Sequence, residues 1–505
     1  MLEKTIFELS SPGRIGHPLP GCDVPERPTE TLIPKSHLRP DPPGLPQVSE
    51  PDAVRHFVRL SALNHHVDKG FYPLGSCTMK YNPKVNEDLA RLPGFTGLHP
   101  MQDASQAQGA LRLMKELGDA LCAISGLDAV SLQPVAGAHG ELCALMMIRA
   151  YHVKQGNPRK KILIPDSAHG TNPASTTIAG YQTVVIKSNS EGLVDPEDLK
   201  AHLDQDVAAV MLTNPNTLGL FEGNILRITE MVHQAGGLVF MDGANLNALM
   251  GLAKPGDMGV DAMHFNLHKT FSTPHGGGGP GGGGVAVTKS LEPFLPVPTI
   301  NVRKDLKGST SPSTSLGTGS RGSGEFEYYL DYDRPDSIGK VHSFFGNFGV
   351  MVKAYAYILT LGGSGLAEAT KHAIVSANYV MRSLQDDYDL PYKAHCKHEC
   401  VLSGLRFRTQ GVKTLDIAKR LLDYGFHAPT IYFPLIVPEA IMIEPTETES
   451  RETLDEFIGA MKQIAKEIAE TPELVKSAPN NTPIGRLDDV KAVKEPRLRW
   501  GGGCG

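Results

Sequence analysis

This sequence has few cysteines, no large excess of either charge and no long apolar runs. Seven cysteines in 505 residues, an odd number without a short repeated spacing, argue against the disulfide framework of a secreted protein and favour a reducing compartment. The 49 basic and 55 acidic residues give a net charge of −6, which offers no basic footprint to nucleic acid or to an anionic membrane surface. The cysteines are Cys22, Cys77, Cys122, Cys143, Cys396, Cys400 and Cys504.

Signals for membrane insertion and secretion are missing as well. No apolar run approaches the roughly 18 residues that span a bilayer. The N-terminus, MLEKTIFELSSPGR, has acidic residues where a signal peptide has a basic region followed by an apolar one. We therefore expect a soluble, cytoplasmic protein. Its length and its 40% hydrophobic content predict two or three domains with a sizeable core.

Glycine and proline, by contrast, are abundant, with 53 and 38 residues. Eleven of the prolines lie between Pro12 and Pro51, so this part of the chain cannot hold long helices and should run extended. It is predicted either to wrap a partner subunit or to be a disordered tail. Together with a helix expected near 51–63, it makes up a first region, 1–70.

From about residue 129 to residue 290, short β-rich runs alternate with helical stretches. Most of the runs are continuously apolar, which is typical of strands buried on both faces. An amphipathic helix at 104–124 precedes them. The predicted fold is α/β with a mostly parallel central sheet, and its ligand site should lie beyond the carboxyl ends of the strands. The predicted strands are 129–133, 161–165, 183–187, 207–212, 237–241, 261–265 and 284–287.

The rest of the chain completes a predicted large domain and adds a smaller one. The segment 291–345 is rich in Ser, Gly, Thr and charge, and is predicted to be an irregular cover or linker at the end of a large domain, 71–345. A small α+β domain follows at 346–474, and a mobile tail at 475–505. The small domain is predicted to hold helices at 347–361, 365–384, 414–424 and 449–467, and strand-like runs at 400–407, 428–437 and 440–445.

Two chemically suggestive residues lie just beyond the ends of predicted strands. Asp242 comes after 237–241, where a carboxylate either keeps a cationic ring nitrogen protonated or caps a turn. Lys269 follows 261–265, where desolvation favours the neutral amine that a Schiff base requires, although a lone lysine is usually a solvated surface charge. Together they match the two protein groups that pyridoxal phosphate enzymes place around their cofactor.

Three loops add to this pattern. The loop 134–141 leads into a helix, where small residues and the helix dipole favour a phosphate group. His169 is placed to stack on an aromatic ring, or is an ordinary hydrogen-bonded loop residue. The segment 276–284 holds eight glycines, which predicts a loop packed closely against a cofactor or a subunit, with a flexible linker as the alternative.

Six motifs lie in order along the chain: PLGSCTMKYNP (73–83), SAHGTNPAS (167–175), DGANLNA (242–248), NLHKTFSTPHGGGGPG (266–281), YGFHAPT (424–430) and EPTETES (444–450). Together they resemble the pyridoxal-phosphate half of the glycine cleavage system P-protein, glycine decarboxylase. The resemblance covers about residues 70–470 and implies a fold-type I pyridoxal-phosphate-dependent transferase. The family also occurs as a fused chain about twice this long, and a single half with a proline-rich arm resembles subunit 2 of the split form. This implies a partner, P-protein subunit 1, and an α2β2 heterotetramer.

The resemblance also implies site residues. Lys269 would be the Schiff-base lysine, Asp242 the pyridinium partner and His169 the residue stacked on the ring. The other implied cofactor contacts are Ala138, His139 and Gly140 at the phosphate, Ala244 on the opposite ring face, Thr213 near the cofactor hydroxyl, and His268.

The predicted substrate contacts come mainly from the motif 73–83, interpreted as a loop that enters the active site. Lys80 is expected to meet the glycine carboxylate; the alternative is a turn closed by side-chain hydrogen bonds. His268 and His275 flank the glycine-rich segment. At least one of them is interpreted as a proton donor or a substrate contact, and the alternative is a structural role for either. The full set of predicted substrate contacts is Ser76, Cys77, Thr78, Lys80, Asn216 and His275.

The implied activity is that of glycine dehydrogenase (aminomethyl-transferring, decarboxylating), an oxidoreductase. Glycine replaces Lys269 on the cofactor, carbon dioxide leaves, and the aminomethyl group passes to the lipoyl disulfide of H-protein. Two alternatives stay open: another fold-type I enzyme, such as an aminotransferase or an amino-acid decarboxylase, and a non-catalytic scaffold subunit, which would not need Lys269. Arg406 and Arg408 are the candidate carboxylate-binding residues of an aminotransferase.

A cluster of histidines and cysteines resembles a metal site. The spacing H-C-x-H-x-C fits none of the usual zinc patterns, and alternate residues of a strand face opposite ways. No metal is therefore expected. The cluster is His395, Cys396, His398 and Cys400. Cys504, in the GGGCG tail, is accessible to oxidation, but no pattern assigns a redox role to it or to Cys77.

Overall fold

The computed structural model describes residues 3–41, 43–273, 281–304 and 326–498. Its contacts divide the chain into two compact units, Met1–Lys69 with Asn481–Gly505, and Gly70–Asn480. The predicted boundary near residue 70 coincides with a boundary between these units, whereas the predicted boundary at 345/346 lies inside the second unit.

The first unit is built around one helix, α1 (Glu50–Leu63). Ser49 caps it by accepting a hydrogen bond from the backbone N–H of Asp52, and Pro51 lies in its first turn, where no N–H is needed. Among the described residues before it, the helical elements are two short 3₁₀ turns, as expected for a proline-rich segment. The elements besides α1 are η1 (Thr29–Thr31), η2 (Lys35–His37) and α14 (Asp489–Lys494).

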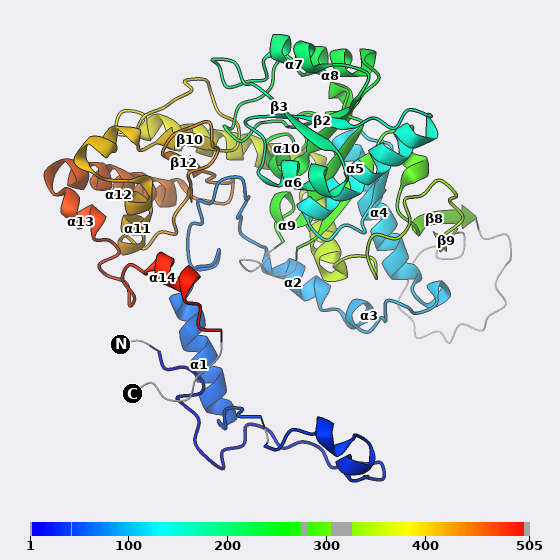
Figure 1. Cartoon of the computed structure of the whole chain (residues 1–505), viewed down its shortest axis with the longest axis vertical. Helices are drawn as coiled ribbons and strands as arrows, with labels where there is room; N and C mark the ends of the chain where they lie inside the picture. The colour runs from blue at the N-terminus through cyan, green and yellow to red at the C-terminus, as the bar shows by residue number, and fades with distance from the viewer. Residues whose placement is uncertain (1–2, 42, 274–280, 305–325, 499–505) are drawn as a thin grey trace. The chain divides into compact units, whose positions relative to one another are not determined.

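A sheet forms the centre of the second unit (Figure 1). It has seven strands, in the order β1-β7-β6-β5-β4-β2-β3. Neighbouring strands in the series β3-β2-β4-β5-β6 are parallel to one another. The strand β7 runs antiparallel to both β6 and β1. All seven predicted strands are confirmed. They are β1 (Ala129–Ser131), β2 (Lys161–Pro165), β3 (Gln182–Ile186), β4 (Val207–Thr213), β5 (Leu238–Asp242), β6 (Ala262–Asn266) and β7 (Gly283–Val287).

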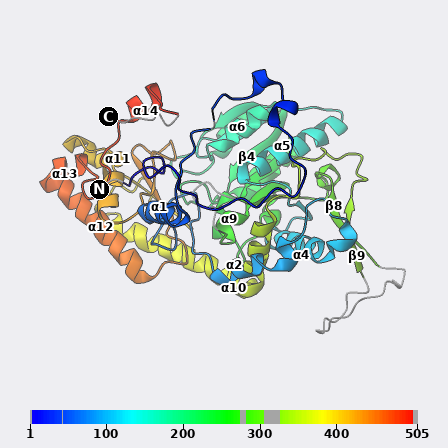
Figure 2. The ribbon, with the colours of Figure 1, turned by 90° about the horizontal axis from the view of Figure 1, so that it is seen from below.

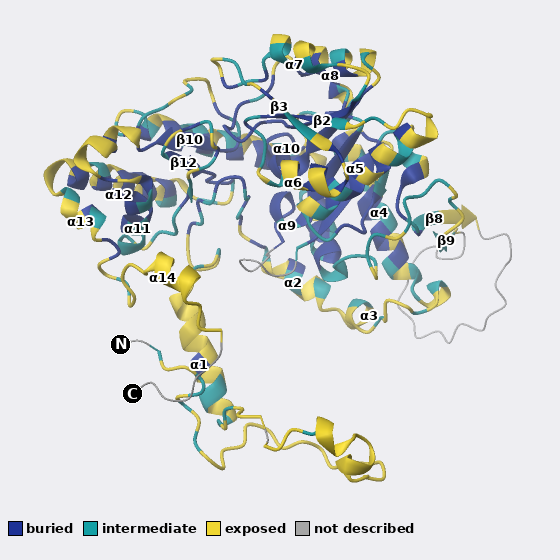
Figure 3. Ribbon diagram, in the orientation of Figure 1, coloured by how far each residue is buried: buried dark blue, intermediate teal, exposed yellow. Residues whose placement is uncertain are grey.

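Helices cover both faces of this sheet, which explains the continuous apolar runs. In the view of Figure 2, α5 (Gly137–Lys154) and α6 (Thr171–Ile178) lie on one side of β4, and α4 (Gln108–Ser125) and α10 (Phe348–Leu384) on the other. Alternate residues of β4 enter different cores: Val210 and Leu212 pack on one side and Met211 on the other. Figure 3 shows the sheet as the most continuously buried part of the unit. The remaining helices of this region are α2 (Lys84–Ala90), α3 (Pro93–Thr96), α7 (Pro196–His202), α8 (Ile225–Gln234) and α9 (Leu267–Thr270).

The helix α10 joins two hydrophobic cores. Two helices are predicted here, and the structure shows two helical stretches that meet at a kink, where Gly362 has φ 61° and ψ 179°. Residues before the kink, such as Val350, pack in the core of the large sheet, and residues after it, such as Val380, pack in a second core. Among the described helices, α10 is long and apolar enough to span a bilayer by length and composition, but this core packing accounts for its apolar residues.

The second core lies on a three-stranded antiparallel sheet, in the order β10-β12-β11. The predicted strand at 400–407 is wrong in its second half, which forms a 3₁₀ turn. The predicted strand at 428–437 keeps only two residues, because Pro434 lies within the run and has no N–H to donate. The elements are β10 (Cys400–Ser403), β11 (Thr430–Ile431), β12 (Ala440–Ile443), α11 (Thr414–Asp423), α12 (Arg451–Glu470) and α13 (Pro472–Lys476).

The segment 291–345 differs from its prediction. A two-stranded antiparallel ribbon, β8 (Thr299–Lys304) with β9 (Phe326–Asp331), forms where irregular chain is expected. The composition of the whole segment is dominated by its Ser- and Gly-rich middle, and this conceals the β-prone residues at either end. The stretch 305–325 between the strands lies outside the described residues. So does 274–280, which includes the beginning of the glycine-rich segment 276–284.

The loop after β4 contacts the segment just before β10 at Gly219. This glycine has φ +75°, and a β-carbon on it would lie 1.9 Å from the carbonyl oxygen of Glu399. The space therefore accepts only glycine.

We expect Gly219→Ala to lower the free energy of unfolding by about 2 kcal/mol or more. The substitution places a side chain on a left-handed backbone, and the new β-carbon clashes with the backbone of Glu399. Chemical denaturation measures the change. Gly223→Ala is the matched control in the same loop, since a β-carbon there meets no atom within 4 Å. Equal stabilities of the two variants would contradict this account of the loop.

Candidate active site at the carboxyl edge of the sheet

The parallel strands bring several predicted site residues to one edge of the sheet. Thr213 and Asp242 end β4 and β5 and are register partners. Asn266 ends the neighbouring strand β6, and Lys269 follows it in α9. Because parallel strands end at the same edge, the three loops that follow these strands converge there.

Asp242 is a buried, well-bonded carboxylate with 1% exposure. It accepts hydrogen bonds from the backbone N–H of Ala244 at 2.8 Å and from the Asn172 amide at 3.1 Å, and Nε2 of His264 lies 3.3 Å away. Burial alone would raise its pKa, but the interactions with the neighbouring imidazoles of His264 and His169 and these two hydrogen bonds outweigh burial and lower the pKa below its usual value. The group is therefore an anion at neutral pH.

His169 is oriented by a chain of hydrogen bonds. Its Nδ1 lies 2.9 Å from the hydroxyl of Thr171, and that hydroxyl donates to Glu141 at 2.6 Å. Ser175 donates to the other oxygen of Glu141 at 2.8 Å. Burial lowers the pKa of His169, while the charge of Asp242 acts in the opposite direction. The ring is thus neutral and held in place.

The N-terminus of α5 fits a phosphate group. The helix begins at Gly137 without a side-chain cap on Ala136, and the N–H groups of a first helical turn have no acceptor within the helix. The N–H of Gly140 is already bonded to the carbonyl of Ala136. A β-carbon at Gly140 would lie 2.7 Å from Cβ of His264, so glycine allows α5 to pack against β6. Nδ1 of His139 lies 3.4 Å from the N–H of Val135 in the same loop.

Lys269 lies against the loop 73–83. Its side chain is 9% exposed, and Nζ donates to the carbonyl oxygen of Ser76 at 2.8 Å. Ser76 adopts a left-handed backbone conformation, φ 58°, and its N–H donates to Glu399 at 2.6 Å. The structure thus brings the N-terminal motif to the lysine across 193 residues of sequence.

Other residues of this loop bond to protein groups near the lysine. The Thr78 hydroxyl donates to Glu444 at 2.5 Å, and burial raises the pKa of the Cys77 thiol. Lys80, predicted to meet a carboxylate, donates to Glu447 at 2.7 Å, and also to Asn247 at 2.9 Å and to Tyr357 at 3.1 Å. Three protein acceptors thus already surround its ammonium group, and its substrate role stays a prediction.

The remaining predicted residues have varied surroundings. The Thr213 hydroxyl is buried and has no hydrogen-bond partner, which is consistent with a ligand contact. The Asn216 side chain accepts hydrogen bonds from the N–H groups of Leu218 and Leu220 in its own loop and donates one to the carbonyl of Gly192. Ala244 is buried next to Asp242, Nδ1 of His268 lies 3.1 Å from the carbonyl of Gly282, and His275 lies outside the described residues.

The arginines considered for an aminotransferase are engaged elsewhere. Arg406 donates to Asp389 at 2.9 Å, and Arg408 lies 3.6 Å from Glu439. Both arginines are more than a third exposed, and their partners are protein carboxylates.

Groups with metal-ligand geometry differ from the predicted cluster. Among the described residues, two sets of side chains lie close enough to share an ion: Glu141, His169 and Asp242, and His398, Glu399 and Glu444. Only His398 belongs to the predicted H-C-x-H-x-C cluster, and Cys396 and Cys400 are buried free thiols. Sequence reasoning missed Glu141, His264, Glu399 and Glu444 as members of the site; a charged or polar residue within or beside an apolar run was the available signal for each.

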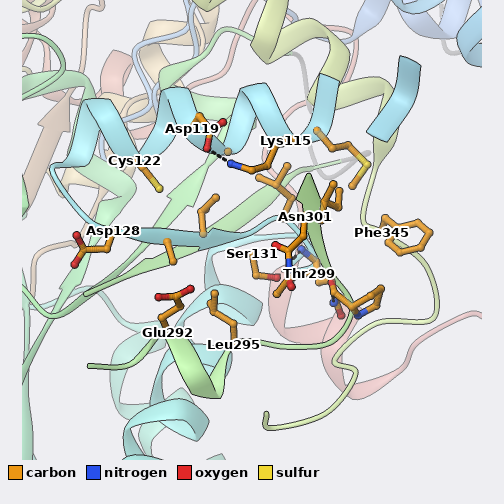
Figure 4. A pocket seen from close by; sticks show the side chains of 18 of the residues that line it. Lys115, Asp119, Cys122, Asp128, Ser131, Glu292, Leu295, Thr299, Asn301 and Phe345 are labelled. Atoms are coloured by element: carbon orange, nitrogen blue, oxygen red, sulfur yellow. Dashed lines mark hydrogen bonds and ion pairs between the residues drawn. The ribbon is translucent and has the colours of Figure 1, made fainter. Parts of the chain in front are cut away.

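A separate cavity of about 180 Å³ lies between α4, β1 and β8 (Figure 4). Lys115 and Asp119 form an ion pair at its wall, and Cys122, Asp128 and Asn301 also line it. It contains none of the predicted site residues.

Comparison with known families identifies the chain. The family model described as glycine cleavage system P-protein matches residues 23–321, more than half of the chain, and the model described as glycine dehydrogenase, C-terminal domain, matches 369–484. The chain belongs to the glycine cleavage system P-protein family. The predicted family is thereby confirmed.

P-protein relatives match over nearly the whole length. A protein of Chloroherpeton thalassium is 57% identical over 500 residues, 99% of this chain and 98% of the relative. A protein of Halalkalibacterium halodurans is 57% identical over 496 residues, 98% of this chain and 97% of the relative. Both are named probable glycine dehydrogenase (decarboxylating) subunit 2.

Solved structures confirm the fold class of this P-protein family member, the α/β fold of fold type I. An inhibitor-bound glycine decarboxylase (P-protein) has a TM-score of 0.71 at 21% identity, with 86% of this chain and 94% of that one covered. A sphingosine-1-phosphate lyase of Burkholderia pseudomallei has a TM-score of 0.60 at 12% identity, with 88% and 96% covered. At these identities the likeness concerns the fold alone.

Replacing Lys80 by Met should destabilise the protein by about 3–5 kcal/mol, because the buried Glu447 carboxylate loses its cationic partner. Denaturation without glycine measures this. Lys289→Met, which breaks an exposed pair with Glu292, should leave stability unchanged. A Lys80 variant as stable as the parent that has lost glycine binding would instead support the predicted substrate contact.

Proposed function

We propose that this chain is the pyridoxal-phosphate-binding subunit 2 of a split P-protein, which decarboxylates glycine and passes the aminomethyl group to the lipoyl disulfide of H-protein. One observation carries the proposal: Lys269, Asp242 and the open N-terminus of α5 converge at one sheet edge in a member of this family. An amine, an anion and a phosphate site are the three protein features that pyridoxal phosphate needs.

The residues present fit this cofactor. Lys269 would bind its aldehyde carbon, Asp242 would hold the proton on its ring nitrogen, and the first turn of α5 would bind its phosphate. His169 would lie against one ring face and Ala244 against the other. When bound, pyridoxal phosphate supplies a ring that accepts the electron pair freed as carbon dioxide leaves.

The protein's own contribution is electrostatic. The lowered pKa of Asp242 keeps this carboxylate ionised, so that it can stabilise a proton on a neighbouring nitrogen. His169 is neutral and therefore adds no competing charge beside that nitrogen. Asp242 and Lys269 are both at least nine-tenths buried, which limits water in the site and strengthens each of these interactions.

The proposed partners follow from membership of this family and from the names of its relatives. The relatives carry the name subunit 2, which supports a separate subunit 1 and, as we propose, an α2β2 heterotetramer in the cytoplasm. Lipoylated H-protein would receive the aminomethyl group. An aminotransferase is disfavoured, because Arg406 and Arg408 are paired with protein carboxylates.

Lys269→Ala should abolish exchange of bicarbonate with the carboxyl group of glycine, because no amine remains to bind the cofactor. Isotope exchange with the co-purified subunit 1 and lipoylated H-protein measures it, and the cofactor's absorbance reports binding independently. Lys371→Ala, at an exposed lysine paired with Glu368, is the control. Exchange that survives in Lys269→Ala would overturn the mechanism, and transamination of a keto acid without exchange would favour an aminotransferase.

Asp242→Asn should slow the exchange roughly 10²–10³-fold, because the amide keeps the shape of the carboxylate but removes the charge that stabilises a protonated ring nitrogen. Asp261→Asn is the control, since this carboxylate precedes β6 at the opposite edge of the sheet. The rate constant at saturating glycine separates the two variants. A similar modest loss in both would indicate that Asp242 has only a structural role.

A further inference from the structure

A buried carboxyl pair lies where β10 and β12 meet. Glu399 directly precedes β10 and Glu444 directly follows β12, and the antiparallel register pairs Cys400 with Ile443, so the two glutamates are set side by side. They are 0% and 1% exposed. With His398, each offers an atom within 4.8 Å of the others.

The two carboxyls differ in their hydrogen bonds. Glu399 accepts from the N–H of Ser76 at 2.6 Å and from the amide of Asn245 at 3.4 Å. One oxygen of Glu444 accepts from the Thr78 hydroxyl at 2.5 Å. Its other oxygen, Oε2, is fully buried and has no hydrogen-bond partner.

His398 gives a second, independent indication of a ligand. Its ring is 0% exposed, and neither ring nitrogen has a hydrogen-bond partner, although Nε2 lies 3.8 Å from Glu399. The hydroxyl of Ser76 is unpartnered as well. An unsatisfied buried polar group costs about 1–3 kcal/mol, so several in one place indicate a bound molecule that satisfies them.

The surroundings of these atoms are rich in acceptors. The Ser76 carbonyl accepts from Nζ of Lys269, and the carboxyl oxygens of Glu399 and Glu444 lie nearby. Burial and the charge of Lys269 lower the pKa of His398 to about 3, so its ring is neutral and retains a lone pair. An amino or ammonium group offers donors and is the chemical match for such a site.

The pair also holds a proton. Burial and the charge of Glu444 raise the pKa of Glu399 well above its ordinary value. Burial raises the pKa of Glu444 to about 8, against the hydrogen bond from Thr78 and the charge of Lys269. Two carboxyls this close in a dry site do not both ionise at neutral pH, and the proton belongs to the pair.

The proposed reaction needs a carrier for one proton. The electron pair of the broken carbon–carbon bond forms the new carbon–sulfur bond, and the electron pair of the S–S bond leaves with the released sulfur. The carbon is thereby oxidised and the disulfide reduced. Glycine starts with an ammonium group and ends as an amine on carbon, while the released sulfur ends as a thiol, so one N–H proton becomes an S–H proton.

We propose that Glu399 and Glu444, together with the Ser76 carbonyl and His398, receive the amino group of glycine and take up the proton that it loses, until the released sulfur accepts it. This inference rests on the function proposed above. An ammonium N–H bond and a carboxyl O–H bond exchange one proton, and no electron moves in this step.

Few other groups near the pair change their charge close to neutral pH. Lys80 and Glu447 form their own ion pair, and burial raises the pKa values of the nearby thiols, which keeps them neutral. Lys269 is thus the main charged neighbour. The titratable groups that face the pair are Lys269, Lys80, Glu447, His398, Cys77, Cys396 and Cys400.

Infrared difference spectroscopy with and without glycine tests the inference on the full-length chain, loaded with pyridoxal phosphate and co-purified with subunit 1. The wild-type protein should show a protonated-carboxyl signal that persists above the usual pH range of carboxyl titration and changes when glycine binds. Glu399→Gln and Glu444→Gln should each lose this response. Glu222→Gln should keep it, because Glu222 is buried elsewhere and accepts from backbone N–H groups.

Thr78→Val provides a variant that leaves both carboxyls intact. Because it removes a donor that stabilises ionised Glu444, the carboxyl signal should persist to higher pH. A glycine response that survives in both glutamine variants would overturn this inference alone. A wild-type spectrum that glycine leaves unchanged would overturn the proposed function and the inference with it.

Discussion

The backbone of Ser76 connects the two sides of the site. Its carbonyl accepts from Lys269, which follows the large sheet, and its N–H donates to Glu399, which precedes the small one. To make both bonds it adopts a left-handed conformation, φ 58°, which costs a residue with a side chain about 1–2 kcal/mol. Gly75 leaves room for the close approach, since a β-carbon there would lie 2.1 Å from Cγ of Met442.

The site holds two carboxylate environments, and the pKa values of the carboxyl groups in them move in opposite directions. Asp242 receives hydrogen bonds and lies near two histidines, so it stays ionised. Glu399 and Glu444 are buried against each other, so their pKa values rise. Groups whose environments separate their pKa values in this way can act as a fixed anion and as a proton acceptor in one site.

Buried charge also explains how the surrounding loops are held. Each ionised group away from solvent must have partners, because an unpaired buried charge costs several kcal/mol. Lys80 meets this requirement through Glu447, Asn247 and Tyr357, which lie 167 to 367 residues away in sequence. The loop 73–83 is therefore fixed by its charges as much as by its packing.

The sequence by itself determined the large sheet and the main chemical groups. Local periodicity is enough to identify strands buried on both faces, and all seven were found because helices cover both sides of the sheet. Lys269 and Asp242 were identifiable because Asp242 ends one such strand and Lys269 lies just beyond the end of another. The ribbon β8–β9 was missed because the composition of its long segment concealed two short β-prone ends.

Only the tertiary structure decided what lies opposite Lys269. Glu399 adjoins residues that resemble metal ligands in sequence, and Glu444 lies in a separate motif. Their roles depend on the register of β10 with β12 and on a hydrogen bond that spans 323 residues. Periodicity and spacing report on neighbours along the chain, whereas the pairing of buried charges is decided by contacts between distant segments, which form only when the chain has folded.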